Sequence, residues 1–336
     1  MDIKNLERWY QENHRKLSFR ETKNPYFIWI SEIMLQQTQV DTVLPYFERF
    51  IIQFPTIKDL AEVEEEVLMK HVEGLGYYRR FRNMQKAAQE IVSKHEGVFP
   101  VTYDDVLALP GIGKYTAGAI MSIAYNKPYS ALDGNVIRVL SRYLGDNRDM
   151  RIEKHKKDLD QINQSYIEKA HPEVYTQAMM ELGATLCKPK NPLCESCPLV
   201  DHCFAYAENR QNEFPFLTKQ KEPKEYYYVT LIIEDKDSVY LRKRDEELLK
   251  GMYEYPQFIN ESLSSIEDDL MDKQIIVKIR DESSTYKHVF SHQIWNMEVH
   301  KATLISGIDP SWIKINKKEI HNIPMAVAHR KINMNR

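Results

Sequence analysis

The chain has 336 residues, of which 43% are hydrophobic and 11% aromatic, and its formal net charge is −3. Two domains are expected at this length, and the hydrophobic content excludes a disordered chain, while the negative charge excludes a broadly basic surface. No apolar run of about 18 residues occurs and the N-terminus lacks the apolar core of a secretion signal, so we expect a cytoplasmic protein with no membrane partner.

Residues 1–207 have the pattern of a helical domain. Apolar residues recur about every 3.6 positions in the segments 26–37, 59–72, 82–95 and 104–109, which prolines, glycines and short polar stretches separate. Glu32 lies in the first of these segments. Two interpretations of Glu32 remain open: a glutamate at the rim of a core helix, or a general acid whose pKa is raised by burial.

The sequence LALPGIGKYTAGAI, at residues 107–120, predicts two helices joined by a tight turn. Pro110 ends the first helix, and Gly111 and Gly113 permit another backbone or a ligand to approach closely. The amides at the start of the second helix suit a phosphate oxygen. This pattern is typical of a helix-hairpin-helix, here at about 104–120, which binds the DNA backbone without reading its sequence.

Asp133 precedes a predicted helix whose apolar residues include Val136, Val139 and Leu140. The local pattern predicts an N-cap, and a carboxylate at a helix N-terminus is favoured in its ionised form. Capping does not exclude a role in chemistry. A protonated carboxyl at Glu32 and an ionised one at Asp133 would form a pair suited to cleaving a glycosidic bond.

All four cysteines of the chain lie within one short segment, 187–203. A disulfide scaffold is not expected in a cytoplasmic protein, so the thiols predict either a tetrahedral zinc site or an iron–sulfur cluster. Zinc sites usually have two C-x2-C pairs and only one is present, which favours the cluster without excluding zinc. The residues in question are Cys187, Cys194, Cys197 and Cys203.

The composition changes near residue 208. Residues 208–225 are polar with two prolines and predict a linker. Beyond it, segments such as YYYVTLIIE and SVYLRKR, and the string KHVFSHQIWNMEVHKATLI, have the alternating or continuous apolar pattern of strands. We therefore expect an all-α domain at 1–207 and a smaller α/β domain at 226–336.

Several strings taken together resemble the MutY family of adenine DNA glycosylases, which belongs to the helix-hairpin-helix glycosylase superfamily. They are SEIMLQQTQV, GLGYYRR, LPGIGKYTAGAI and LDGNVIRV, with the four cysteines, and they cover about residues 5–207. GMYEYPQF and HVFSHQIW resemble strings of the family's MutT-like (Nudix-like) domain. The resemblance implies a base-excision repair enzyme that flips adenine out of double-stranded DNA containing A:8-oxoguanine or A:G mispairs. We expect it to be a monomer, associated with the nucleoid if the source is bacterial.

The resemblance also implies roles for individual residues. Glu32 would protonate adenine at N7, and Asp133 would stabilise the sugar cation that forms as the base leaves. Tyr115 and Asn135 would belong to the same pocket, and the four cysteines would hold a [4Fe-4S] cluster. The residues implied to contact DNA or a base are Arg20, Gln37, Tyr77, Gly111, Gly113, Gln177, Phe290, Ser291 and His292. Among these, Arg20 and Gln177 resemble adenine-pocket residues, Gln37 and Tyr77 residues inserted near the opposing 8-oxoguanine, and residues 290–292 the loop that senses it.

The sequence departs from the family pattern at three places. Ser18 and Phe19 stand before Arg20 where the family commonly has Pro-Trp, and Gln39 stands where an arginine is common. Phe19 keeps an aromatic face, whereas the change at Gln39 is expected to weaken a phosphate contact. The second domain lacks the acidic REUXEE motif that a pyrophosphohydrolase needs for its metal, so we expect a recognition module.

Three alternative functions agree less well with the sequence. An endonuclease III-like lyase needs a lysine amine for a Schiff base, and the resemblance places Tyr115 at that lysine's position. The neighbouring Lys114 is rotated by about 100° around the helix axis and is not expected to replace it. A non-catalytic damage binder would be expected to have lost Glu32 or Asp133. A nucleotide-sanitising hydrolase would need the missing acidic motif.

Overall fold

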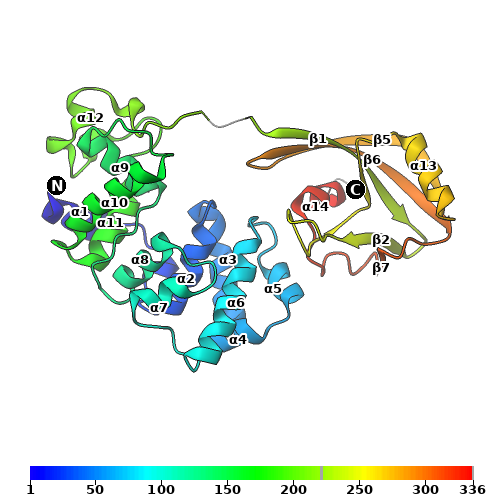
Figure 1. Cartoon of the computed structure of the whole chain (residues 1–336), viewed down its shortest axis with the longest axis horizontal. Coiled ribbons are helices and arrows are strands. Elements are labelled where there is room, and N and C mark those ends of the chain that lie inside the picture. The colour runs from blue at the N-terminus through cyan, green and yellow to red at the C-terminus, as the bar shows by residue number, and fades with distance from the viewer. Residues whose placement is uncertain (220–221, 335–336) are drawn as a thin grey trace. The chain divides into compact units, whose positions relative to one another are not determined.

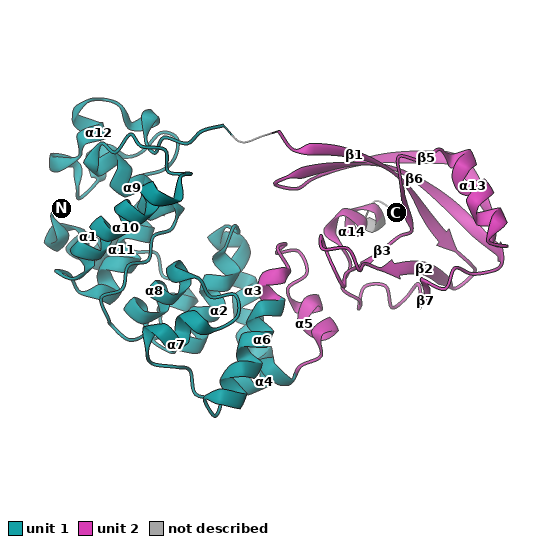
Figure 2. Ribbon diagram, in the orientation of Figure 1, with its two compact units in different colours: residues 1–62, 82–219 teal, residues 63–81, 220–336 magenta. Residues whose placement is uncertain are grey.

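The computed structural model describes residues 1–219 and 222–334. Part of the predicted linker, residues 220–221, and residues 335–336 lie outside the described residues. The chain divides into two compact units: the first comprises residues 1–62 and 82–219, and the second comprises residues 63–81 and 220–336 (Figure 2). The segment 63–81 thus groups with the C-terminal part of the chain. The boundaries of 1–207 and 226–336 stay a prediction.

The first unit is helical, in agreement with the pattern of residues 1–207 (Figure 1). The predicted helix at 26–37 ends at Leu35, since Gln36 and Gln37 form a turn, and the predicted helix at 59–72 is divided between α4 and α5. Helix α6 (Arg79–Lys94) begins in the second unit and continues into the first. The other helices of the first unit are α1 (Ile3–Asn13), α2 (Pro25–Leu35), α3 (Val40–Gln53), α4 (Ile57–Glu62), α7 (Tyr103–Ala108), α8 (Lys114–Ile123), α9 (Gly134–Leu144), α10 (Glu153–Ile167), α11 (Pro172–Thr185) and α12 (Phe204–Ala207).

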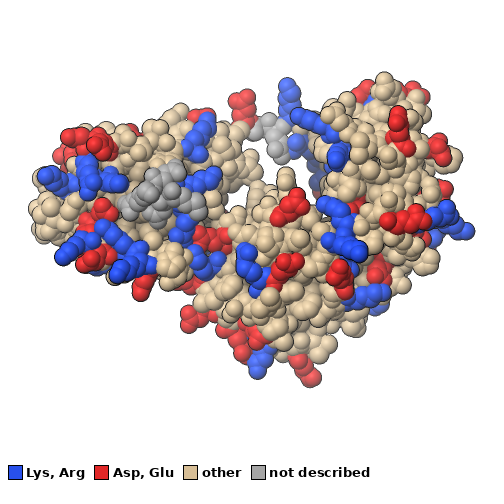
Figure 3. Space-filling view, turned by 180° about the vertical axis from the view of Figure 1, so that it is seen from behind, with Lys and Arg blue, Asp and Glu red and all other residues tan. Residues whose placement is uncertain are grey.

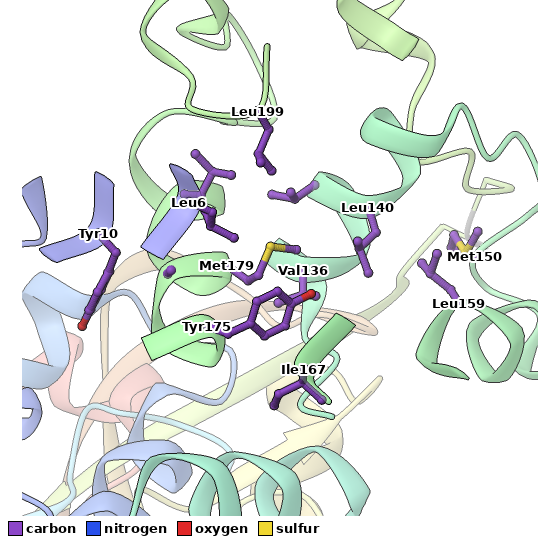
Figure 4. Close-up of a cluster of buried hydrophobic side chains, with 13 residues drawn as sticks. Leu6, Tyr10, Val136, Leu140, Met150, Leu159, Ile167, Tyr175, Met179 and Leu199 are labelled. Carbon is purple, nitrogen blue, oxygen red and sulfur yellow. The ribbon is translucent and has the colours of Figure 1, made fainter. Parts of the chain in front are cut away.

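One hydrophobic core of the first unit joins α1, α9, α10 and α11 (Figure 4). Leu6, Leu140 and Met179 are fully buried in it. Leu199, from the loop that carries the cysteines, packs into the same core, and Cys187 and Cys197 pack against it. Because each buried aliphatic side chain contributes about 1.5–3 kcal/mol, this core fixes both the start of α9 and the cysteine loop.

Helices α7 and α8 form the predicted hairpin. Gly111 has φ +79°, in the left-handed region, and a Cβ there would lie 2.6 Å from the Cβ of Asn83, so only glycine fits without strain. Gly113 caps α8 with extended backbone, no side chain caps the helix, and a Cβ at Gly113 would meet open space. The interior of the protein therefore requires Gly111, whereas nothing inside it requires Gly113.

The second unit contains α5 (Glu65–His71) and a seven-stranded mixed sheet within its described residues. The main path of the sheet is β3-β2-β1-β6-β5, with β1 and β6 parallel. Alternate residues of β1 face two cores: Ile232 packs with α14 on one face, and Leu231 packs with α13 on the other. The elements are β1 (Lys224–Glu234), β2 (Ser238–Lys243), β3 (Tyr253–Glu254), β4 (Gln257–Ile259), α13 (Leu263–Asp272), β5 (Ile276–Val289), β6 (Gln293–Ser306), β7 (Trp312–Asn316) and α14 (Val327–Met334).

The string predicted as strand at 287–305 folds as two strands of a hairpin. Residues 290–292 form the loop between β5 and β6, closed by the Phe290 N–H, which donates to the carbonyl of Gln293 at 2.8 Å. The ring of Phe290 lies edge-on to Trp295, at a centroid distance of 4.9 Å. Ser291 and His292 are exposed at the tip. Packing of Phe290 therefore anchors a loop that presents two polar side chains.

Candidate active site

Glu32 is the one acidic side chain of α2, a helix that is almost entirely buried. Its carboxyl group is only 5% exposed, and the Tyr115 hydroxyl of α8 donates a hydrogen bond to its Oε2 at 2.5 Å. Burial raises the pKa of Glu32 to about 7, and the Asp133 charge adds to this, while the Tyr115 bond and Arg20 oppose it. The predicted rise in pKa is confirmed, so a proton is available at Glu32 near neutral pH.

Asp133 is the N-cap of α9, as its sequence context predicts. Its Oδ1 accepts from the Val136 N–H at 2.7 Å, and its Oδ2 accepts from the Asn135 side-chain amide at 2.9 Å. Burial raises the pKa of Asp133, against the effect of these two donors and of Arg138. Capping was expected to favour the ionised form of Asp133, whereas burial favours the protonated form. Both oxygens are held in fixed directions.

Glu32 and Asp133 line one cleft of about 470 Å³. This volume is in the usual range for sites that enclose a small molecule, about 300–1,000 Å³. The cleft also contains four other side chains expected at the adenine pocket: Arg20, Tyr115, Asn135 and Gln177. The structure thus brings together six residues that the sequence places between positions 20 and 177.

Arg20 and Gln177 are held from behind the cleft. Arg20 donates from Nη2 to the Oε2 of the fully buried Glu181 at 2.8 Å, and Arg15 binds the same carboxylate. Burial alone would raise the pKa of Glu181, but the hydrogen bonds from Arg15 and Arg20 outweigh it and lower the pKa to about 2. The Oε1 of Gln177 accepts from the Tyr10 hydroxyl at 3.1 Å. Glu181 therefore fixes the guanidinium of Arg20, and with it a positive charge, at the wall of the cleft.

Sequence reasoning missed Arg138, which also lines the cleft. Its Nη2 donates to the Asn135 Oδ1 and to the Gly183 carbonyl, each at 2.8 Å, and its Nε donates to the Cys187 carbonyl at 2.8 Å. A Cβ at Gly183 would lie 2.5 Å from the Cβ of Asn135, so glycine lets α11 approach the start of α9. The spacing of Asn135 and Arg138 by one turn was the available signal.

The four cysteines line a single small cavity beneath the loop at 187–203. Sulfurs around one tetrahedral zinc lie about 3.8 Å apart, given zinc–sulfur bonds of about 2.3 Å. Within the described residues, no group of three or more His, Cys, Asp or Glu side chains is arranged to hold one ion. Burial raises the pKa of Cys197 to about 12, so its thiolate needs a cationic partner. Four thiols around one cavity are the ligand set that an iron–sulfur cluster requires.

Arg142 secures this loop from α9. It is buried, and its guanidinium donates to the Cys187 Sγ at 3.3 Å and to the carbonyls of Lys188 and Pro189 at 2.7 and 3.1 Å. Arg138 and Arg142 are four residues apart, so one face of α9 contacts the cysteine loop while its N-terminus carries Asp133. The loop and the carboxylate thus share one helix.

The protein purified without oxygen is expected to be brown and to contain about four irons per chain, because four thiolates ligate a cluster of that size. Iron and zinc analysis by mass spectrometry checks this. We expect Cys194→Ser to lower the melting temperature or DNA affinity before it affects base release, because the cysteine cavity and the cleft have no residue in common. Stoichiometric zinc without iron would contradict the cluster.

The two residues predicted to insert into the duplex both have backbone in the left-handed region. Gln37 follows α2 with φ +56°, and its exposed side chain lines a second cavity next to the cleft. Tyr77 has φ +47°, is 47% exposed and lies between Gly76 and α6. Such strain costs about 1–3 kcal/mol for a residue other than glycine, so the surrounding structure must enforce it.

The sequence has a run of cations at the start of α6, namely Arg79, Arg80, Arg82 and Lys86, but one of them is not at the surface. Arg80 is buried and donates to the Leu75 carbonyl at 3.1 Å, and burial lowers its pKa to about 10. Arg79, Arg82 and Lys86 remain at least partly exposed. On the face shown in Figure 3, positive and negative side chains are interspersed. Helix amides and a few exposed cations must therefore supply the contacts to phosphate.

Three family descriptions match the chain. Residues 30–169 match the HhH-GPD superfamily of base excision DNA repair proteins, residues 187–203 the iron–sulfur binding domain of endonuclease III, and residues 228–334 the NUDIX domain. A thermostable thymine-DNA glycosylase superposes with a TM-score of 0.56 at 25% identity, over 61% of this chain and 95% of that chain. Endonuclease III trapped on DNA gives a TM-score of 0.52 at 25% identity, over 62% of this chain and 94% of that chain.

Curated relatives match nearly the whole chain. The adenine DNA glycosylase of Buchnera aphidicola subsp. Acyrthosiphon pisum is 37% identical over 85% of this chain and 82% of its own length. The adenine DNA glycosylase of Buchnera aphidicola subsp. Baizongia pistaciae is 38% identical over 93% of this chain and 86% of its own length. The Homo sapiens adenine DNA glycosylase is 27% identical over 96% and 72%.

The fold, the buried carboxyl in its cleft and these matches define a DNA glycosylase of base-excision repair, with a helix-hairpin-helix domain, a [4Fe-4S] cluster in the region of residues 187–203 and a C-terminal Nudix-like domain. The DNA substrate follows from the same matches. The chain belongs to the adenine DNA glycosylase family. In the part of the chain that the structure describes, no helix is both long and apolar enough to cross a membrane.

Proposed function

We propose that the protein hydrolyses the N-glycosidic bond of adenine paired with 8-oxoguanine or guanine in duplex DNA. The single observation that carries this proposal is Glu32, a buried carboxyl with a pKa of about 7 that lines the same cleft as Asp133. A cleft of about 470 Å³ accommodates one purine, which must leave the duplex to enter it. The names of the relatives support adenine as that purine.

Glu32 is proposed as the general acid. Adenine is a poor leaving group as an anion, and protonation at N7 lets it depart as a neutral base. A carboxyl group with a pKa near the working pH is best suited to give up such a proton. The hydrogen bond from Tyr115 holds Oε2, so Oε1 is the oxygen available to the base.

Asp133 is proposed to face the sugar as positive charge develops at its anomeric carbon. Its two hydrogen bonds, from the Val136 N–H and the Asn135 amide, fix the carboxylate so that it needs no reorganisation when the cation forms. Arg138 holds Asn135 from its other end. Water then completes the hydrolysis, and the DNA keeps an abasic site.

A lyase reaction has less support. No lysine is found among the described residues that line the cleft, and the Tyr115 hydroxyl, at the position where the lyase family has its lysine, is engaged with Glu32. Lys114 is exposed and lies one position before Tyr115, in the first turn of α8. A Schiff base with the sugar therefore has no amine positioned to form it.

An assay on four duplexes tests the proposal. Purified protein is given adenine opposite 8-oxoguanine, guanine and thymine, and a damaged pyrimidine opposite guanine, with borohydride added in a parallel set. We expect free adenine from the first two duplexes, little from the others and no trapped protein–DNA adduct. Release of the pyrimidine, or a borohydride adduct, would support the endonuclease III-like alternative, and binding without release a damage binder.

The tip of the β5–β6 hairpin is proposed to read the base opposite adenine. 8-Oxoguanine offers an N7 hydrogen and an O8 acceptor where guanine has a bare N7, and a hydroxyl can act as donor or acceptor to either. The exposed Ser291 and His292 are placed on a loop anchored by Phe290. In this proposal residues 226–336 form a recognition module.

The double variant Ser291→Ala/His292→Ala is expected to narrow the preference for 8-oxoguanine over guanine by about 5–100-fold, because one base contact is worth about 1–3 kcal/mol. Cleavage of both mispairs remains measurable, since neither residue lines the cleft. Single-turnover rates on the two duplexes, with a melting curve for each protein, give the ratio. An unchanged ratio in a folded variant would move the recognition role elsewhere, with Gln37 and Tyr77 as the next candidates.

A further inference from the structure

Within the second unit, a hydrogen bond connects a turn and a hairpin tip that are distant in sequence. The Tyr77 hydroxyl donates to the Ser291 Oγ at 2.8 Å, between the turn before α6 and the tip of the β5–β6 hairpin. Both side chains are exposed, so water competes for this bond and it contributes little free energy by itself. Something else must hold the turn at this distance from the hairpin.

An enclosed ion pair joins the segment 63–81 to α14 of the same unit. Arg330 of α14 binds Glu73 through two parallel bonds, from Nε to Oε1 at 2.6 Å and from Nη2 to Oε2 at 3.1 Å. The same guanidinium donates to the carbonyls of Ile320 and Ile323 at 2.9 and 2.8 Å. The Glu73 and Arg330 side chains are 13% and 14% exposed. This planar two-point contact restricts both position and orientation.

Among the described residues, two other ion pairs join the segment 63–81 to the C-terminal part of the unit, and both are far more exposed. Glu66 and Lys243, at 3.1 Å, are 40% and 43% exposed, and Arg79 and Glu247, at 3.3 Å, are 80% and 81% exposed. Pairs in such surroundings contribute about 0–1 kcal/mol, because water and salt screen them. Loss of Glu73 would leave the enclosed Arg330 guanidinium without a carboxylate, which costs more than breaking an exposed pair, whereas loss of Arg330 would leave Glu73 bound to Lys70 at 2.7 Å.

Glu73 is four residues before Tyr77, and the chain between them contains Gly74 and Gly76, both with positive φ. The turn belongs to no helix or strand, but the Gly74 N–H donates to the Tyr78 hydroxyl at 3.0 Å and the Arg80 guanidinium donates to the Leu75 carbonyl at 3.1 Å. These bonds tie the turn to the start of α6, and Glu73 holds its other end. Displacement of Glu73 would move Tyr77 with it.

We propose that the Glu73–Arg330 ion pair is a positioning element for opposite-base discrimination: it fastens the Tyr77 turn to the sheet so that the Tyr77 hydroxyl meets Ser291. An Oγ that accepts from Tyr77 can give its own hydrogen to another partner, either a base or the neighbouring His292 Nδ1 at 3.4 Å, so the contact orients the hydroxyl at the hairpin tip. The inference rests on the proposed function of that tip. Neither Glu73 nor Arg330 touches the base.

The test compares single-turnover base release opposite 8-oxoguanine and opposite guanine. We expect Glu73→Gln and Arg330→Gln each to narrow the ratio of these rates by about 5–20-fold, in the range of coupling between sites. The matched control is Glu247→Gln, which makes the same change in the exposed pair and should leave the ratio within about twofold. The reversed pair, Glu73→Arg with Arg330→Glu, should recover at least part of the ratio that either single reversal loses.

A double-mutant cycle shows whether Glu73 acts through Tyr77. If it does, the double variant Glu73→Gln/Tyr77→Phe should narrow the ratio only as much as the single variant with the larger effect. One outcome is that the ratio changes in Tyr77→Phe and Ser291→Ala but stays unchanged in Glu73→Gln and Arg330→Gln. That result would overturn only the positioning role of the ion pair. Ratios unchanged in all four would overturn recognition at the hairpin as well. Full additivity with Tyr77→Phe would also contradict the inference.

Discussion

Replacement of Glu32 by glutamine is expected to abolish adenine release while DNA binding persists. Glutamine has nearly the shape of glutamate and can keep the contact with the Tyr115 hydroxyl, but it has no acidic proton to give to N7. General acid catalysis typically contributes about 10²–10⁴-fold, so a loss of this size is expected. Single-turnover assays with excess enzyme, together with a binding measurement on the same duplex, separate the chemical step from affinity.

The same variant is expected to be more stable than the wild type above neutral pH. The folded-state pKa of Glu32, about 7, exceeds the ordinary value of 4.5, so stability falls as pH rises from 4.5 to 7 and the loss is complete above that. Glutamine carries no charge to bury and avoids a cost on the order of 1–3 kcal/mol. Melting curves at about pH 8 and pH 5 should show the gain at the higher pH. A variant with wild-type base release, or one destabilised equally at both pH values, would remove Glu32 from this role.

Replacement of Asp133 by asparagine is expected to slow base release by about 10²–10³-fold, the usual effect of removing one fixed electrostatic group from a transition state. The Oδ1 of asparagine can still accept from the Val136 N–H, so the cap of α9 should survive. The variant therefore separates the charge of Asp133 from its capping. The measurements are the single-turnover rate and the melting temperature of the same preparation.

The matched control for this prediction is Thr102→Val, which removes the side-chain cap of α7 and leaves α9 intact. Its melting temperature should fall by a few degrees, in keeping with about 1 kcal/mol for a lost cap, with little change in rate. An activity loss in Asp133→Asn that follows its loss of thermal stability would show that Asp133 acts only as a cap.

The sequence predicts those features of the site that local rules decide. Asp133 caps a helix because a short acceptor precedes an apolar repeat, and that pattern is visible without the fold. The two domain types were also predictable, since helical and strand periodicities differ. Burial of Glu32 was one of two open interpretations, because it depends on packing of α2 against α8 and other elements that are distant in sequence.

Features that depend on long-range partners could not be predicted. Arg80 appears in the sequence as one of a run of cations, yet it is buried, because only the fold shows which face of α6 is turned inward. The bonds from Arg138 to the Cys187 carbonyl and from Arg330 to Glu73 join positions 49 and 257 residues apart. No local pattern contains such pairs.

The pH dependence of adenine release tests the central claim most directly. Wild-type protein in excess is mixed with duplex containing adenine opposite 8-oxoguanine, and single-turnover rates are measured from about pH 5 to pH 9. If Glu32, with its pKa of about 7, gives its proton to the base, the rate should fall about tenfold per pH unit above neutrality. The residual rate of Glu32→Gln should lack this dependence. A wild-type rate that stays level to pH 9, or a Glu32→Gln profile with the same descent, would contradict the assignment.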